Sequence, residues 1–181
     1  MSKHDHLYEK TISSQPIYDG RIIKVKVDEV LLPNGNTAKR EIVNHQGAVA
    51  VLPLTDDGKM IAVRQFRKPL ERTIVEIPAG KLEPGEEPLT CAKRELEEET
   101  GISDKDIILT HLIDFTYHIH NCYVEVYVGR LNKEFNVHGE ENELLWTDLN
   151  HDFFDMSQYA GEGNIGHIIE HVKISKDMLL R

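Results

Sequence analysis

Apolar and polar residues alternate in short stretches near the start of the chain, a pattern that predicts β-strands. Ile22–Leu32 (IIKVKVDEVLL) alternates in part, as a strand with one buried face does. Residues 33–36 (PNGN) form a turn sequence, because Asn and Gly tolerate positive φ, and Ala38–Val43 is then the returning strand. A hairpin of this size buries too little apolar surface to be stable alone. We therefore expect it to pack on the rest of the chain or on a second copy of the chain.

The remainder of the chain predicts a mixed sheet flanked by helices. Further strands are predicted at Ala48–Leu54, Met60–Phe66, Thr73–Ile77, Ile107–Phe115, Tyr123–Leu131 and Leu144–Thr147. Pro78-Ala79-Gly80 interrupts the strand pattern and opens a Gly/Pro-rich loop that runs to Pro88. Helical segments are predicted near Leu89–Thr100, Asp148–Tyr159 and Ile165–Leu179. Gly101 suits the left-handed position that follows the first of these helices.

The helix predicted at Leu89–Thr100 has an apolar face and an acidic face. Its core-facing stripe consists of Leu89, Ala92 and Leu96. The acidic face carries Glu95, Glu98 and Glu99. Their carboxylates project from the same side of the helix because the residues are three and four positions apart. Like charges at this spacing destabilise a bare helix by roughly 0.2–0.5 kcal/mol per pair. Divalent cations such as Mg²⁺ reverse that sign, since they bind carboxylate oxygens and bridge to phosphates; the alternative is a solvated acidic helix face.

Composition and charge limit which kinds of molecule the protein is expected to bind. The chain has 181 residues, enough for one domain or one domain with a small appendage. Its formal net charge is -10, which argues against nucleic-acid binding, because that binding depends on cationic neutralisation of phosphates. A small phosphate compound would be repelled as well, unless bound cations or a local basic cluster changed the local charge.

Hydropathy predicts the location of the protein. The longest apolar runs are far too short to cross a bilayer, and the first ten residues (MSKHDHLYEK) lack the apolar core of a secretory signal. Two cysteines, Cys91 and Cys122, do not make a disulfide framework. We therefore expect a cytoplasmic protein without membrane association.

The spacing of residues from Gly80 to Ile102 carries the most specific signal. It reads Gly80, five residues, Glu86, seven residues, Arg94-Glu95-Leu96, one residue, Glu98-Glu99, one residue, Gly101-Ile102. This pattern resembles the complete box of the Nudix hydrolases. Residues 39–43 (KREIV), 63–67 (VRQFR) and 76–80 (EIPAG) also resemble the bacterial ADP-ribose pyrophosphatase branch of that family. The likeness is close from about residue 10 to 102 and looser afterwards.

The resemblance implies an architecture and a partner. The fold is expected to be an α/β/α sandwich around a mixed sheet, formed by residues 45–181, with a small N-terminal antiparallel β subdomain in residues 1–44. The N-terminal strands are expected to pack across to a second copy in a homodimer. The implied cofactor is Mg²⁺, with Mn²⁺ as an alternative, and the implied ligand is a small nucleotide sugar.

The resemblance also assigns roles to the residues of the box. Glu95 and Glu99 are implied as the main metal ligands, and Glu98 as a further ligand or a group behind the ligands. The carbonyl of Ala79 is implied to face a metal as well. Arg94 is implied to pair with Glu86 and so to hold the helix and the preceding loop in register.

Residues outside the box are implied to contact the substrate. Arg67 is expected to meet phosphate, Glu76 to lie at the substrate, and Arg40 to reach it from the partner subunit. For Arg40 and Arg67 the alternative is an ordinary surface ion pair. In the implied reaction, water attacks one phosphorus in line while the metals neutralise the diphosphate. The expected base is Glu141, with Glu143 as second choice; the alternative for both is an exposed acidic turn.

One loop departs from the branch it otherwise resembles. Residues 116–122 (TYHIHNC) contain no proline or glycine, and Cys122 occupies the position at which the branch carries an acidic residue. His118 and His120 are candidates to hydrogen-bond a sugar or phosphate; without a third ligand nearby they read otherwise as polar loop residues. This departure leaves open which sugar the nucleotide-sugar substrate carries.

Three functions are therefore compatible with the sequence. The leading hypothesis is hydrolysis of ADP-ribose to AMP and ribose 5-phosphate. The second keeps this chemistry and changes the substrate, for example to ADP-glucose or GDP-mannose. The third is a catalytically silent domain that senses a nucleotide sugar, although such domains are expected to lose box carboxylates and this chain retains all of them.

Overall fold

The computed structural model describes residues 5–117, 121–131 and 143–148. The chain divides into two compact units, described separately below. The N-terminal unit comprises residues 1–47 and 116–123, and the main unit comprises residues 48–115 and 124–181. The helices predicted at Asp148–Tyr159 and Ile165–Leu179 lie outside the described residues, as do Glu141, His118 and His120.

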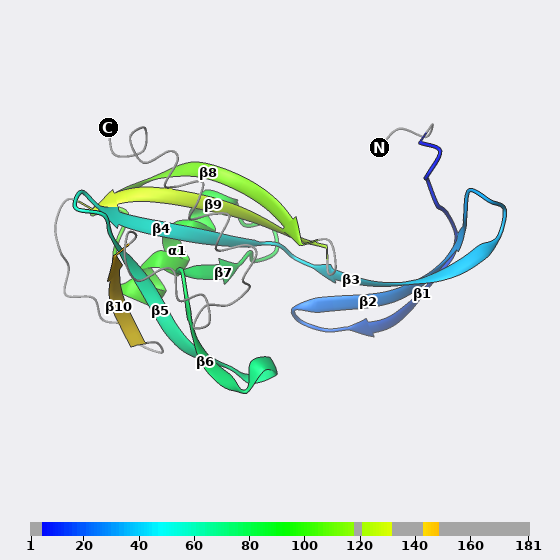
Figure 1. The fold of residues 1–181 in the computed structure, drawn as a ribbon, viewed down its shortest axis with the longest axis horizontal. Coiled ribbons are helices and arrows are strands. Elements are labelled where there is room, and N and C mark those ends of the chain that lie inside the picture. The colour runs from blue at the N-terminus through cyan, green and yellow to red at the C-terminus, as the bar shows by residue number, and fades with distance from the viewer. Residues whose placement is uncertain (1–4, 118–120, 132–142, 149–181) are drawn as a thin grey trace. The chain divides into compact units, whose positions relative to one another are not determined.

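The N-terminal unit contains an antiparallel three-stranded sheet (Figure 1). Its strands are β1 (Lys10–Asp19), β2 (Ile23–Leu31) and β3 (Thr37–His45), in that order. The hairpin predicted between β2 and β3 is present. In its turn Gly35 has φ +86°, and the Leu32 N–H donates to the Asn36 carbonyl at 2.8 Å. The predicted subdomain is thus a real sheet, to which β1 adds a long third strand.

Strand β1 is exposed along its whole length. Its large apolar side chains Ile12, Ile17 and Tyr18 are each more than half exposed to solvent. Asp28 on β2 is by contrast only 3% exposed. It accepts hydrogen bonds from the Ser14 hydroxyl at 2.5 Å and from Lys26 Nζ at 2.8 Å, so the buried charge is compensated.

The main unit is built on a mixed sheet, which in the described residues has seven strands. The strands are β4 (Ala48–Thr55), β5 (Lys59–Arg67), β6 (Arg72–Glu76), β7 (Ala79–Lys81), β8 (Ile107–Tyr117), β9 (Cys122–Leu131) and β10 (Glu143–Asp148). The order is β10-β5-β4-β9-β8. Strands β4 and β9 pair in parallel, whereas β10 pairs with β5, and β5 with β4, in antiparallel fashion.

Strands β6 and β7 fill a gap inside this sheet. Strands β4 and β5 pair through Leu54 and Met60 near their shared turn; farther along, β6 pairs with β5 and β7 pairs with β4. The prediction that a loop begins at Pro78-Ala79-Gly80 is therefore wrong, because strand β7 forms there. Backbone groups of β4 need partners in this region, and β7 and the residue before it supply them: the Val51 N–H, for example, donates to the Pro78 carbonyl at 2.8 Å.

Helix α1 (Pro88–Thr100) lies against one face of this sheet (Figure 1). Pro88 stands in its first turn, where no backbone N–H is needed, and Gly101 ends it with φ +73°, as predicted. The helix buries Cys91, Ala92 and Leu96 against the sheet. Leu89, predicted to be part of this stripe, is 41% exposed, because Cys91 occupies the core-facing position instead. Within the described residues no helix is long and apolar enough to cross a membrane.

Candidate metal and phosphate site

Two of the three predicted carboxylates of α1 turn into the protein. Glu95 is largely buried, and Glu99 accepts a hydrogen bond from the backbone N–H of Ala79 at 3.0 Å. Glu98 is 60% exposed and lies at the rim of the group. The helix thus presents Glu95 and Glu99 to β7, with Glu98 on the solvent side. The sequence predicted the shared face but not this inequality.

Gly80 on β7 makes the close approach of Glu95 geometrically feasible. A Cβ atom built on Gly80 would lie 1.7 Å from Cδ of Glu95, far inside van der Waals contact. Any side chain at this position would displace the Glu95 carboxyl group. Gly80 is therefore required for space between strand and helix, a reason that differs from the tight loop suggested by the sequence.

Arg94 connects the carboxylates to one another. Its guanidinium donates to both oxygens of Glu86, each at 2.9 Å, which is the pairing predicted from the box. Its Nη1 donates to Glu95 at 2.8 Å and to Glu98 at 3.1 Å. The hydrogen bond from Arg94, followed by one from the Glu83 N–H, lowers the pKa of Glu86 to about 2. Arg94 thus fixes the loop, through Glu86, and two carboxylates of the helix.

Glu99 is the carboxyl group with the most strongly raised pKa in the described part of the site. Its pKa is raised to about 7: burial is the largest cause and the nearby charges of Glu95 and Glu76 add to it, against the lowering effects of the Ala79 N–H and Arg67. Burial and the neighbouring carboxylates therefore disfavour the ionised form of Glu99. A divalent cation would favour that form, and carboxylate oxygens are the ligands that Mg²⁺ prefers, so the residues present fit such an ion.

Arg67 and Glu76 border the same group. They lie on the paired strands β5 and β6, and Arg67 donates through Nε and Nη2 to one oxygen of Glu76, at 2.9 and 2.5 Å. Both charges affect the pKa of Glu99. The ion pair considered as the alternative for Arg67 is therefore present, and it holds the guanidinium beside the carboxylates of α1.

Two further predicted residues, Arg40 and Glu143, have ion-pair partners of their own. Arg40 is in the N-terminal unit and forms an ion pair with Glu9, with Nη2 2.6 Å from the Glu9 carboxylate. Glu143 begins β10 and forms an ion pair with Arg64 at 3.5 Å. Leu144, the next residue, packs against the core cluster that contains helix α1, so the alternation of the strand directs Glu143 to the opposite face of the sheet.

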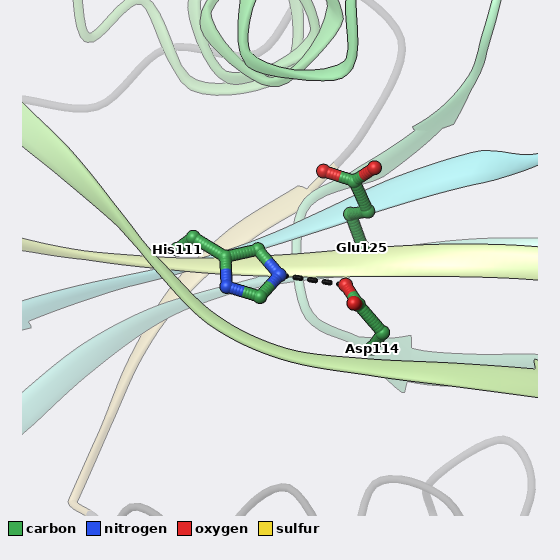
Figure 2. A group of neighbouring side chains, drawn as sticks. All are labelled: His111, Asp114 and Glu125. Carbon is green, nitrogen blue, oxygen red and sulfur yellow. Dashed lines mark hydrogen bonds and ion pairs between the residues drawn. The ribbon is translucent and has the colours of Figure 1, made fainter.

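A second group of acidic and histidine side chains was not found from the sequence. His111 and Asp114 on β8 and Glu125 on β9 bring one potential ligand atom each within 4.8 Å of one another (Figure 2). His111 Nε2 lies 2.6 Å from Asp114 Oδ1, and the Tyr127 hydroxyl donates to Glu125 at 2.7 Å. These contacts satisfy the three groups among themselves and with Tyr127, so we assign no ion to them. Their separation in sequence gave no motif to detect.

Comparison with known families covers most of the chain. The family described as NUDIX domain matches residues 44–161, and the family described as Nucleoside diphosphate sugar hydrolase N-terminal domain matches residues 9–43. A solved structure described as "Crystal structure of ADP compounds hydrolase" superimposes with a TM-score of 0.73 at 19% identity, covering 94% of this chain and 95% of that one. This likeness confirms the expected α/β fold with its mixed sheet.

Curated relatives match about half of the chain. An ADP-ribose pyrophosphatase of Bacillus subtilis (strain 168) is 64% identical over 101 residues, which are 56% of this chain and 55% of that protein. A methanol dehydrogenase activator of Bacillus methanolicus is 62% identical over 93 residues, 51% of this chain and 50% of that protein. An ADP-ribose pyrophosphatase of Mycobacterium tuberculosis is 41% identical over 103 residues, 56% of this chain and 48% of that protein. The chain thus spans about half the length of the curated relatives it matches.

Proposed function

The chain belongs to the NUDIX domain family, and from this membership we propose that it hydrolyses the pyrophosphate bond of a nucleoside diphosphate sugar with the help of a divalent metal ion. The proposed substrate is ADP-ribose, and the products are AMP and ribose 5-phosphate. The carrying observation is the pair Glu95 and Glu99, drawn against β7, where burial and the neighbouring carboxylates raise the pKa of Glu99. The names of the Bacillus and Mycobacterium relatives support the choice of ADP-ribose.

The proposed cofactor is Mg²⁺, with Mn²⁺ as an alternative. Glu95 and Glu99 would hold it, with Glu98 and the Ala79 carbonyl as further ligands. When bound, such an ion neutralises the diphosphate and lowers the pKa of a water molecule that it contacts. The buried position of Glu95 and the hydrogen bond on Glu99 support this ligand set. Both fix the carboxylates before an ion arrives.

The protein's own residues would bind and orient the substrate. Arg67, held by Glu76, is proposed to donate to a phosphate oxygen, and its nearness to Glu99 supports this role. A base is proposed to take the proton of the water that attacks one phosphorus, while the other phosphate leaves. Glu141 remains the first candidate for this base and Glu143 the second; the position of Glu143 on the face of the sheet opposite to α1 argues against Glu143.

The proposed assembly is a cytoplasmic homodimer in which the N-terminal sheet packs on the partner subunit. The exposed apolar side chains Ile12, Ile17 and Tyr18 of β1 support this proposal, because a lone sheet leaves them in water. Arg40 on the same sheet is proposed to contact the substrate bound to the partner. His118 and His120 are proposed to contact the sugar or phosphate.

A second candidate function retains the chemistry and changes the sugar. The segment of residues 116–122 has no proline or glycine, unlike the branch that the rest of the chain resembles. A relative named ADP-sugar pyrophosphatase, from Mus musculus, is 30% identical over 131 residues. ADP-glucose and GDP-mannose are therefore alternative substrates. A silent sensor is disfavoured by the full set of box carboxylates.

A substrate panel tests the proposal directly. The purified protein is incubated with Mg²⁺ and with ADP-ribose, ADP-glucose, GDP-mannose or NAD, and the nucleotide products are separated by chromatography. We expect the highest kcat/KM for ADP-ribose, with AMP as product, and loss of turnover with EDTA. A higher kcat/KM for another nucleotide sugar would assign that compound as the substrate in place of ADP-ribose. The absence of turnover on every compound would refute the proposed enzymatic activity.

A further inference from the structure

The contacts of Arg94 extend beyond the carboxylates already described. Its Nη2 also points to the carbonyl of Lys81 at 3.4 Å and to the sulfur of Cys91 at 3.3 Å. Lys81 ends β7, and Cys91 lies one turn before Arg94 on α1. The guanidinium therefore contacts the strand, the loop and the helix at once. Its orientation depends on all three, not on Glu86 alone.

Cys91 occupies the core side of this junction. It is fully buried, in the place where the apolar pattern alone had predicted Leu89 to face the core. Its thiol donates to the Lys81 carbonyl at 3.4 Å while its sulfur accepts from Arg94. The thiol thus has hydrogen-bonding partners on the strand and on the helix, and it also interacts with the Glu86 carboxylate of the loop.

We propose that Cys91 is a positioning residue for the cation site, because its thiol ties the Arg94 guanidinium to β7 and so sets where Arg94 holds Glu95 and Glu98. The chain of contacts is continuous: thiol to guanidinium at 3.3 Å, and guanidinium to Glu95 at 2.8 Å and to Glu98 at 3.1 Å. Cys91 does not belong to the residues that define the box. This inference rests on the proposed cation requirement and deepens it.

The expected effect of removing the thiol is on affinity for the cation. In Cys91→Ala, Arg94 Nη2 and the Lys81 carbonyl each lose a partner, and the guanidinium gains freedom to rotate away from Glu95. Removal of a group that directly supports a metal ligand lowers affinity by about 10–100-fold. Cys91 acts one contact farther away, so we expect a loss of about threefold to tenfold. In Cys91→Ser a hydroxyl can serve both partners, so affinity should remain within about twofold of wild type.

The experiment measures binding of Mn²⁺ alone by the loss of the free-ion signal in electron paramagnetic resonance. Wild type, Cys91→Ala and Cys91→Ser are compared with Ile107→Val, which thins the same core cluster from strand β8. Thermal melts of the metal-free proteins report how far each substitution disturbs packing. The proposal requires weaker Mn²⁺ binding in Cys91→Ala, recovery in Cys91→Ser, and wild-type binding in Ile107→Val.

Two results would overturn the proposal. One is unchanged Mn²⁺ affinity in Cys91→Ala, whatever its melting temperature, which would make the residue a packing residue only. The other is equal weakening in Cys91→Ala and Cys91→Ser. The test is separate from that of the substrate, because no nucleotide is present. A wild-type protein that binds Mn²⁺ but turns over no nucleotide sugar would refute the proposed function and leave this inference standing.

Discussion

At the scale of single residues, the candidate site is defined by crowding and by charge. Gly80 provides the space that the Glu95 carboxyl group fills. Arg94 donates hydrogen bonds to the carboxylates of Glu95 and Glu98. Glu99 is the carboxyl group of the site whose pKa burial raises. These three observations concern residues of the box, and each leads to a different expectation for a substitution.

The first expectation concerns Glu99 and pH. Its pKa is about 7 in the folded protein, because of burial, against an ordinary value of 4.5. When folding raises the pKa of an acid, the stabilisation is complete below the unfolded-state pKa and is lost as pH rises through the folded-state pKa. The metal-free protein should therefore lose stability between about pH 4.5 and pH 7. Glu99→Gln should remove this part of the dependence, as thermal melts in EDTA across this range would measure.

The same substitution separates stability from activity. Addition of Mg²⁺ above pH 7 should raise the melting temperature of wild type more than that of Glu99→Gln, since a bound ion stabilises the state that binds it. Turnover should fall by about 100-fold or more in the variant. A variant with lower stability and an unchanged rate per folded molecule would show that Glu99 is not a ligand.

Substitution of Gly80 tests the close approach between β7 and α1. Gly80→Ala should displace the Glu95 carboxyl group, raise the Mg²⁺ concentration for half-maximal turnover by about tenfold, and lower kcat. Gly35→Ala is the control, because Gly35 has a positive φ and no atom near the added methyl group. It should cost about 1 kcal/mol in urea unfolding and leave the Mg²⁺ dependence unaltered. Similar Mg²⁺ dependence in both variants would contradict the crowding argument.

At the scale of elements, helix α1 and strand β7 form the site together. The helix supplies Glu95, Glu98 and Glu99, and the strand supplies the backbone of Ala79, Gly80 and Lys81 against which they pack. Strand β7 exists because β4 and β5 diverge after their shared turn and β4 needs a second partner. Anchoring of α1 in the core therefore determines how well the carboxylates are placed.

A matched pair of leucines tests this anchoring. Leu96 is 1% exposed in the core cluster, whereas Leu89 on the same helix is 41% exposed. Leu96→Ala should lower the free energy of unfolding by about 2–5 kcal/mol, because it removes buried contacts and leaves a cavity. Leu89→Ala should change it by about 0.5 kcal/mol or less. If chemical denaturation gave equal losses of unfolding free energy for the two variants, Leu89 would face the core, as the sequence pattern predicted.

At the scale of the whole molecule, the N-terminal sheet raises the question of assembly. Its strand β1 is exposed throughout, and several of its apolar side chains face solvent within one subunit. The proposed homodimer removes them from water. It also gives Arg40 a route to a substrate that the partner binds, which links the assembly to the proposed reaction.

Sedimentation tests the proposed assembly. We expect the wild-type protein to have twice the mass of a single chain, which is 20.7 kDa. Ile17→Glu places a charge on the exposed apolar surface of β1 and should shift the mass toward that of one chain, with loss of activity if Arg40 acts across the interface. Lys10→Gln, at the start of the same strand, changes the net charge by the same single unit and is the control. A wild-type mass near 20.7 kDa would refute the dimer.

Much of the fold was predictable because its elements depend on local patterns. The β2–β3 hairpin follows from the turn at Gly35, and helix α1 ends where Gly101 permits positive φ. The hydrophobic periodicity did not predict strand β7 or the exposure of Leu89, because neither depends on the local sequence alone. A three-residue strand forms only where a neighbouring strand lacks partners, and the buried face of a helix depends on what the sheet presents to it.

By itself the sequence determined the family, the helix that carries the carboxylates and the pairing of Arg94 with Glu86, because the spacing of residues along one helix and loop encodes them. Only the tertiary structure decided that Glu95 packs on Gly80, that Glu99 is held by the Ala79 backbone, and that Cys91 contacts Arg94. These contacts join strand β7 to helix α1, and their distances depend on how the sheet packs against the helix. Residue spacing specifies what a helix can present, whereas packing decides which atoms it meets.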